Sequence, residues 1–94
     1  MWQIEEHRRV DKQRSGDVPV EVLKRYEIWK DIVRLSGPPG LRVVKGFHDE
    51  ALSGQWKGHR CSRLGLQWSA IYQVVADTLL IRVVHVAAHD LRRS

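Results

Sequence analysis

Apolar side chains recur along the first third of the chain with the spacing of an amphipathic helix. The positions concerned, spaced i, i+4, i+7 and i+11, are Val22, Tyr26, Trp29 and Val33. Ahead of them, Asp17 can cap a helix, and Pro19 suits a first turn because the N–H that proline lacks has no partner there. Glycine followed by prolines then marks a stop, since proline cannot continue a helix. The pattern predicts a helix that buries one face and ends within Ser36–Gly40.

The last third of the chain is rich in Ile, Val, Leu and aromatic residues and is interrupted by short turns. The expected strands and turns are His59–Leu64, a turn at Gly65, Trp68–Val75, a turn at Ala76–Asp77, and Thr78–Val86. Strands joined by such short turns predict an antiparallel meander. In the third strand apolar residues fall on both faces, which is typical of a central strand covered by helices on at least one side.

The remaining segments are less regular. Trp2 and Ile4 alternate with polar residues as in a short strand, and the charged segment Arg8–Arg14 fits a brief helix. Leu41–Gly58 is expected to be mainly loop with one short turn of helix. The order strand, helix, helix and three strands predicts an α+β fold, with two helices packed on an antiparallel sheet. A chain of 94 residues suffices for one domain, residues 1–94.

The charge balance favours a polyanionic partner. Lys and Arg number 16 against 11 Asp and Glu, so the formal net charge is +5, and such a field raises encounter rates with nucleic acid. Many small proteins are basic without binding nucleic acid, so charge alone leaves both readings open. The single cysteine, Cys61, allows neither an intramolecular disulfide nor a cysteine-based zinc site, which fits a reducing cytoplasm. We expect no signal peptide and no segment that spans a bilayer.

Two sequence motifs carry a resemblance to a known family. Leu52–Arg60 reads L-S-G-Q-W-K-G-H-R, and Trp68–Tyr72 reads W-S-A-I-Y. They resemble the L-x-G-x-W-K-G-x-R and W-x-x-I-Y signatures of YafQ-type toxins in the RelE superfamily, which has the same order of elements. The resemblance implies a RelE-like fold and a toxin of a type II toxin–antitoxin system. Such a toxin cuts messenger RNA in the ribosomal A site without a metal or other cofactor, and a cognate antitoxin silences it in a hetero-oligomer.

The resemblance also implies catalytic roles for three residues. His89 matches the family histidine at the end of the last strand. Glu50 stands where YafQ-type toxins have a histidine and where YoeB-type toxins have a glutamate that acts as base. Arg63 replaces a second family histidine, Gln67 replaces an aspartate, and Ser69 stands where YoeB and RelE have an arginine. The implied catalytic set is His89, Glu50 and Arg63. It therefore combines residues that match different relatives.

The residues themselves supply the chemistry that metal-free RNA cleavage requires. The reaction needs a base for the 2′-hydroxyl proton, a cation for the phosphorane oxygens and an acid for the leaving 5′-oxygen. His89 can act as acid or base near neutral pH, and Glu50 can act as base; the alternatives are a solvated histidine and an ordinary loop carboxylate. Arg60 and Arg63 are three positions apart on one strand, so they point to opposite faces. At most one of them can therefore meet the phosphate, unless a bulge intervenes.

Further residues are candidates for binding the substrate, namely Arg60, Lys57, Trp68, His48 and His85. Lys57 can contact an RNA backbone or be solvated, and Arg60 can face solvent or the antitoxin. Trp68 can stack on an unpaired base or pack in the core. The histidines are scattered and lack support from cysteines or carboxylates, so we expect no metal site.

Two other functions stay open. A ParE-like toxin has the same fold but inhibits DNA gyrase, and the pair of His89 and Glu50 favours an RNase over it. A catalytically idle basic module would only bind nucleic acid or a partner protein, with an affinity that falls as salt rises. For a toxin, the exposed apolar faces are expected to be covered by an amphipathic segment of the antitoxin.

Overall fold

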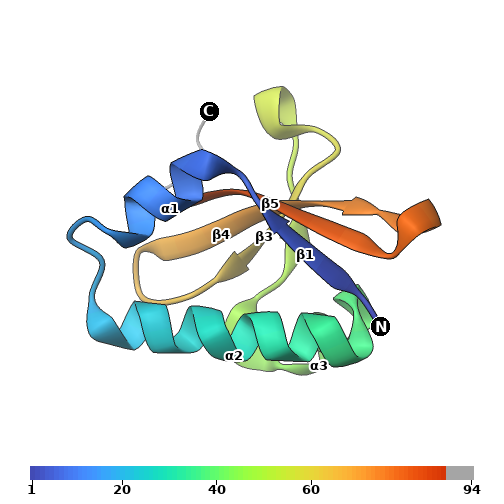
Figure 1. The fold of residues 1–94 in the computed structure, drawn as a ribbon, viewed down its shortest axis with the longest axis horizontal. Helices are drawn as coiled ribbons and strands as arrows, with labels where there is room; N and C mark the ends of the chain where they lie inside the picture. Colours follow the sequence, from blue (N-terminus) through green and yellow to red (C-terminus); the bar gives the residue numbers. More distant parts are fainter. Residues whose placement is uncertain (89–94) are drawn as a thin grey trace.

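The computed structural model describes residues 1–88, which fold around a five-stranded sheet (Figure 1). The strands are β1 (Gln3–Glu6), β2 (Glu50–Ala51), β3 (Arg60–Arg63), β4 (Trp68–Val75) and β5 (Leu80–Ala88). They lie in the order β1-β5-β4-β3-β2. The predicted antiparallel meander is confirmed in β3, β4 and β5. The last strand is an interior strand of the sheet, as its apolar pattern predicted.

The two outer strands differ from the expectation of a purely antiparallel sheet. β1 pairs parallel with β5, with Ile4 opposite Ile81, so the sheet is mixed. This pairing joins the two ends of the sequence and leaves no mark in the local pattern of either strand. β2, which lies in the segment expected to be loop, is a two-residue strand antiparallel to β3.

The main helix, α2 (Val20–Ser36), packs along one face of the sheet (Figure 1). All four residues of its predicted apolar stripe are buried. Trp29 lies at their centre, with its ring 5.8 Å from that of Tyr26 and 5.3 Å from that of Tyr72 on β4. The shorter helix α1 (Arg8–Arg14) was also predicted; it contacts β5 and buries Val10.

The prolines that end α2 begin another helix. α3 (Pro38–Val43) has them in its first positions, where their missing N–H groups cost nothing. The prediction of loop was therefore incomplete. Gly37 joins the two helices with a φ of 69°, a conformation that glycine adopts without steric cost. Three short 3₁₀ turns follow, η1 (Lys45–Phe47), η2 (Gly54–Trp56) and η3 (Ala76–Thr78), the last of which delays the final strand to Leu80.

A bulge in β5 decides which side chains face the helices. Ile71 pairs with His85, but Tyr72 pairs with Val83, so one residue of β5 is left without a partner on β4. Val83 and Val86 are both buried on the helix side. Val84 packs on the other side with Ile71, in a small second cluster. The bulge thus resets the alternation of the strand, and His85 lies on the face opposite to α2.

The two sides of the sheet are covered unequally. The main core lies between the sheet and the helices. On the other side, residues 1–88 form a smaller buried cluster of Cys61 and Ile71, against which Leu52, Trp56 and Val84 pack. Within the described residues, no helix is both long enough and apolar enough to cross a membrane.

Candidate functional site

The sheet face turned away from α2, here called the open face, carries a row of side chains from four strands. Directly opposed residues of neighbouring strands share a face. The register places Glu50 opposite Cys61, Cys61 opposite Ile71, and Ile71 opposite His85. Arg63 follows Cys61 by two positions and therefore points to the same face. The open face thus brings together three predicted site residues, Glu50, Arg63 and His85.

Arg63 lies on β3, between the strands that carry Glu50 and His85. Strands lie about 4.8 Å apart and residues rise about 3.4 Å along them, so the backbone of Arg63 is about 8 Å from Glu50 and about 12 Å from His85. Glu50 and His85 are three strands apart, or about 14 Å. The long side chains of Arg63 and Glu50 can contact the same phosphate group. His85 would contact a neighbouring part of an extended ligand.

Arg60 points to the opposite face from Arg63 and is held by a buried carboxylate. Its Nε and Nη2 atoms lie 2.8 and 2.7 Å from Oδ1 of Asp49, whose side chain is fully buried. The hydroxyls of Ser62, at 2.7 Å, and of Tyr72 donate to the other oxygen of Asp49. Burial by itself lowers the pKa of Arg60, but the hydrogen bond and charge of Asp49 outweigh it and raise the net pKa. Arg60 is thus engaged inside the protein, and Arg63 is the better placed cation for a ligand.

Trp56 stands on the open face between two histidines. Its ring lies 5.6 Å from that of His59, edge to face, and 6.0 Å from that of His85. The indole N–H is buried and has no hydrogen-bond partner among the described residues. Lys57 is exposed at the end of η2, next to Trp56. Aromatic rings beside a cation suit the stacking of unpaired bases and contact with their phosphates.

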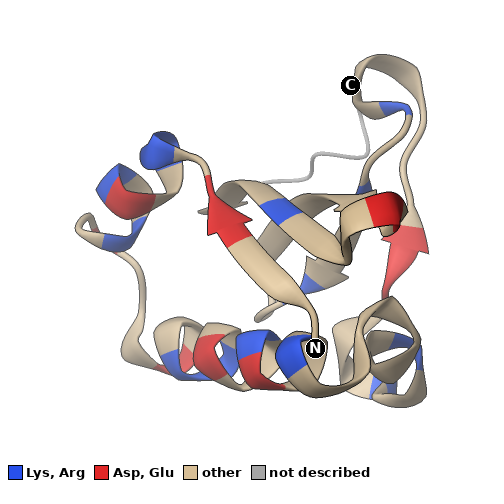
Figure 2. Cartoon of the chain, turned by 45° about the vertical axis from the view of Figure 1, so that its right-hand side comes forward, with Lys and Arg blue, Asp and Glu red and all other residues tan. Residues whose placement is uncertain are grey.

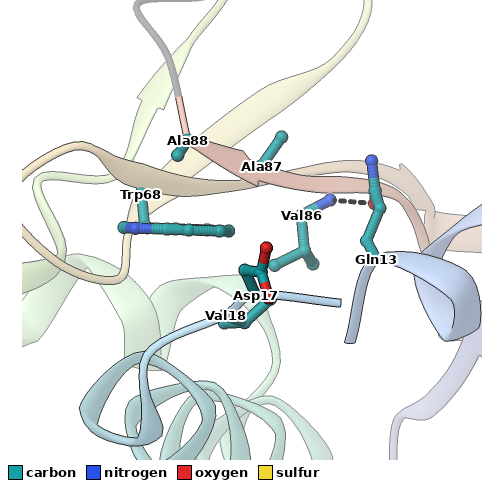
Figure 3. A pocket seen from close by; sticks show the side chains of 7 residues that line it. All are labelled: Gln13, Asp17, Val18, Trp68, Val86, Ala87 and Ala88. Carbon is teal, nitrogen blue, oxygen red and sulfur yellow. Dashed lines mark hydrogen bonds between the residues drawn. The ribbon is translucent and has the colours of Figure 1, made fainter. Parts of the chain in front are cut away.

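Besides Arg60, two predicted substrate-binding residues, Trp68 and His48, lie away from the open face. Trp68 points to the helix side, where it packs against the main core and lines a cavity of about 270 Å³ (Figure 3). The other residues around this cavity are Gln13, Asp17, Val18, Val86, Ala87 and Ala88. His48 is exposed and follows η1 in a left-handed conformation, with a φ of 45°. The sheet itself separates Trp68 from Glu50 and Arg63.

His89, the residue predicted as acid or base, lies outside the described residues. Strand β5 is described as far as Ala88, and Ala87 is opposite Ser69, which in turn is opposite Arg63. Between residues 1 and 88, no group of three or more His, Cys, Asp or Glu side chains is arranged to hold a metal ion.

Lys and Arg residues are spread over the helices and the sheet (Figure 2). Several of those in the helical layer are neutralised by carboxylates. Lys30 is buried, with its Nζ 3.0 Å from Glu27 and 3.6 Å from Glu6, and Arg14 pairs with the same two carboxylates. Tyr26 also donates to Glu6, and burial followed by this hydrogen bond raises the pKa of its hydroxyl. These cations support the packing of β1, α1 and α2.

Three residues of importance here were not singled out by sequence reasoning. Asp49 reads as a loop carboxylate, and only its partners on β3 and β4 identify it as buried. Gln13 lies on α1 and bonds to both Val86 and His85 on β5, for which the sequence carries no signal. Trp56 stands inside the W-K-G motif, so the motif could have marked it as a site residue.

This arrangement, a five-stranded mixed sheet with α2 packed on one face, is similar to the fold of solved RelE-like toxins. A chain of the archaeal RelE–RelB complex from Pyrococcus horikoshii OT3 has a TM-score of 0.71 at 21% identity, covering 96% of this chain and 97% of that one. YafQ from E. coli strain BL21(DE3) has a TM-score of 0.66 at 17% identity, and the match covers 94% of this chain and 93% of YafQ. A chain of the YoeB–YefM complex from Staphylococcus aureus has a TM-score of 0.68 at 13% identity, covering 96% and 99%.

No family model and no curated protein matches the sequence at a significant level. At such low identities the structural matches establish the fold. The resemblance in the sequence motifs is thus confirmed as a shared RelE-like architecture.

Proposed function

We propose that this protein is the toxin of a type II toxin–antitoxin system and that it cleaves messenger RNA on the ribosome. Its partner would be a cognate antitoxin. Support comes from the fold, which is also that of proteins solved as the RelE–RelB, DinJ–YafQ and YoeB–YefM complexes. The net charge of +5 suits work in the cytoplasm on messenger and ribosomal RNA.

The observation that carries the proposal is the presence of Glu50 and Arg63 on adjacent strands of the same open face. RNA can be cut without a metal when its own 2′-oxygen attacks the phosphorus. A 2′,3′-cyclic phosphate then forms as the bond to the 5′-oxygen breaks. Glu50 takes the proton of the 2′-hydroxyl, and Arg63 stabilises the charge on the phosphorane oxygens.

The leaving 5′-oxygen needs a proton, and His89 is the residue proposed to supply it. A histidine suits this step because its pKa lies near neutral pH in the absence of strong perturbation. Trp56 and Lys57 are proposed to hold flanking nucleotides by stacking and by contact with the backbone. The reaction requires no bound cofactor.

The test is a translation reaction in which purified protein is added and the messenger RNA is mapped by primer extension. We expect cleavage at positions linked to the ribosomal A site. Glu50→Gln and Arg63→Ala should each slow cleavage by about 100-fold or more, because each removes one transition-state interaction. His89→Ala should slow it to a similar extent.

Arg42→Ala is the matched control, because Arg42 is an exposed cation on α3, within the helical layer. It removes the same charge and should leave cleavage nearly unchanged. An equal loss in Arg42→Ala and Arg63→Ala would reduce the role of Arg63 to general electrostatics. Absence of cleavage together with inhibition of DNA supercoiling by gyrase would replace the proposal with the ParE-like alternative.

A further inference from the structure

The shortest strand of the sheet carries the proposed base. β2 consists of Glu50 and Ala51 and lies at the edge of the sheet, antiparallel to β3. A pairing of two residues specifies its register weakly, and a slip by one residue would move the Glu50 side chain to the helix side of the sheet. The position of Glu50 therefore depends on contacts outside this two-residue ladder.

Asp49, the residue directly before β2, makes such contacts with two other strands. Its Oδ1 accepts from Nε and Nη2 of Arg60, at 2.8 and 2.7 Å. Its Oδ2 accepts from the hydroxyl of Ser62 at 2.7 Å and from that of Tyr72 on β4. The register of β2 and β3, extended by one residue, puts Asp49 opposite Ser62. The four hydrogen bonds are therefore compatible with this register and would be broken by a slip.

The direction of the Asp49 side chain determines that of Glu50. Asp49 reaches Tyr72, which belongs to the main core, so its carboxylate lies on the helix side of the sheet. Successive residues of a strand point to opposite faces, and Glu50 is thereby directed to the open face. The donors Arg60 and Ser62 lie on the same strand as Arg63. The Asp49 carboxylate thus sets the position of Glu50 relative to the strand that carries Arg63.

We propose that Asp49 is a positioning residue: by holding β2 in register on β3, it keeps the Glu50 carboxylate on the open face beside Arg63. The register role is inferred from hydrogen bonds and strand pairing alone. Its consequence for catalysis rests on the proposed function, in which Glu50 takes the proton of the 2′-hydroxyl. Asp49 itself lies on the helix side of the sheet and does not touch the substrate.

The two buried tyrosines provide a matched pair of variants. Tyr72→Phe removes one donor to Asp49, whereas Tyr26→Phe removes a donor to Glu6, on the strand at the opposite edge of the sheet. Both rings contact the ring of Trp29 and would keep this packing. The two changes should therefore have similar effects on global stability, while only Tyr72→Phe should loosen β2.

The register role is measured by amide hydrogen exchange in the full chain without RNA. The N–H of Leu52 donates to the carbonyl oxygen of His59 at 2.9 Å, directly after β2, so its exchange reports on the pairing of β2 with β3. Exchange at Leu52 should become faster by about 3-fold or more in Tyr72→Phe and stay unchanged in Tyr26→Phe. The amides of the β4–β5 ladder are the internal reference, because a loss of global stability would affect them as well.

A second variant separates positioning from stability. Asp49→Leu combined with Arg60→Met removes the hydrogen bonds but leaves no unpaired charge, so the protein should fold. Exchange at Leu52 should be about 10-fold faster or more, and the close contact between the Hα atoms of residues 51 and 60, a non-hydrogen-bonded pair, should be lost. The maximal rate of cleavage on ribosomes should fall about 10–100-fold because the base is misplaced. The half-saturating concentration should hardly change, because Glu50 acts in the transition state.

The possible results separate this inference from the proposed function. Unchanged exchange at Leu52 in both the Tyr72→Phe protein and the double variant would overturn the register role, and so would equal effects of Tyr72→Phe and Tyr26→Phe. A native maximal rate in a double variant with displaced β2 would refute the consequence for catalysis. If the unsubstituted protein cuts no RNA, the RNase proposal fails, while the exchange data still decide whether Asp49 holds β2 in register.

Discussion

Replacing Asp49 by alanine should destabilise the fold more than any change at the surface. The Asp49 carboxylate is fully buried and accepts hydrogen bonds from the side chains of Arg60, Ser62 and Tyr72. Those groups come from two strands, β3 and β4. Without the carboxylate, a guanidinium and two hydroxyls lose their acceptor at once, inside a well-packed part of the molecule.

The expected loss follows from the burial of the partners. Breaking a buried ion pair by removing one member costs about 3–5 kcal/mol, because an uncompensated charge remains. The Arg60 side chain is 25% exposed, so water can partly solvate it, and the lower part of this range applies. A loss of about 3 kcal/mol lowers the melting temperature of a domain of this size by about 12 °C or more.

The assay is urea denaturation followed by tryptophan fluorescence, with thermal unfolding as a second measurement. Asp31→Ala is the matched control, because Asp31 forms an exposed ion pair with Arg34 at 3.2 Å. Such a surface pair contributes about 0–1 kcal/mol. Combining Asp49→Leu with Arg60→Met should cost less than the sum of the two single changes, since neither charge is then left unpaired.

A loss of stability in Asp49→Ala as small as that in Asp31→Ala would contradict a structural role for the Asp49 carboxylate. A loss of cleavage without a loss of stability in Arg60→Ala would also contradict it, because Arg60 would then serve the substrate and not the fold.

Two further predictions concern stability. Both tyrosines of the chain, Tyr26 and Tyr72, are buried, and burial followed by a hydrogen bond to a carboxylate raises the pKa of each. Unfolding lets them ionise at their ordinary pKa of 10.0. Above about pH 10 the folded state therefore binds more protons than the unfolded state. The free energy of unfolding should fall there, by up to about 1.4 kcal/mol per pH unit for each tyrosine. Phenolate absorbance in the native protein near pH 10 would contradict this prediction. Gly37→Ala should cost about 1–3 kcal/mol in denaturant unfolding, because Gly37 has a φ of 69° and an added Cβ would lie 2.3 Å from Nε1 of Trp2. Gly16→Ala, whose Cβ would meet nothing closer than 3.4 Å, should cost little, and equal losses would count against this account.

Much of the fold could be read from local patterns. The helix of α2 follows from the spacing of Val22, Tyr26, Trp29 and Val33, because only one face of a surface helix can be apolar. The meander of β3, β4 and β5 follows from short apolar runs with turns between them. The prediction of mainly loop in Leu41–Gly58, after a stop at the prolines, missed α3 (Pro38–Val43). Prolines that end one helix also suit the first turn of the next.

The candidate site was predicted in part. The family resemblance proposed Glu50 and Arg63 as site residues, and the structure places both on the open face. Strand alternation predicted that Arg60 and Arg63 lie on opposite faces, which the structure confirms. Alternation could not put His85 on the open face, because the bulge adds one residue to β5, where apolar side chains point both ways. Nor could it decide between the two alternatives for Trp68, because an aromatic residue suits both a core and a binding surface; the structure packs Trp68 against the main core.

The sequence by itself thus determined the helical face, the meander and the chemical types available for catalysis, because each depends on residues close together in the chain. Tertiary structure alone decided which of these side chains lie close together. Asp49 accepts hydrogen bonds from Arg60, 11 positions away in the sequence, and from Tyr72, 23 positions away. Gln13 contacts His85, which lies 72 positions away in the sequence. Such pairings depend on strand order and on a single bulge, and a shift of one residue in β5 would turn His85 into the core.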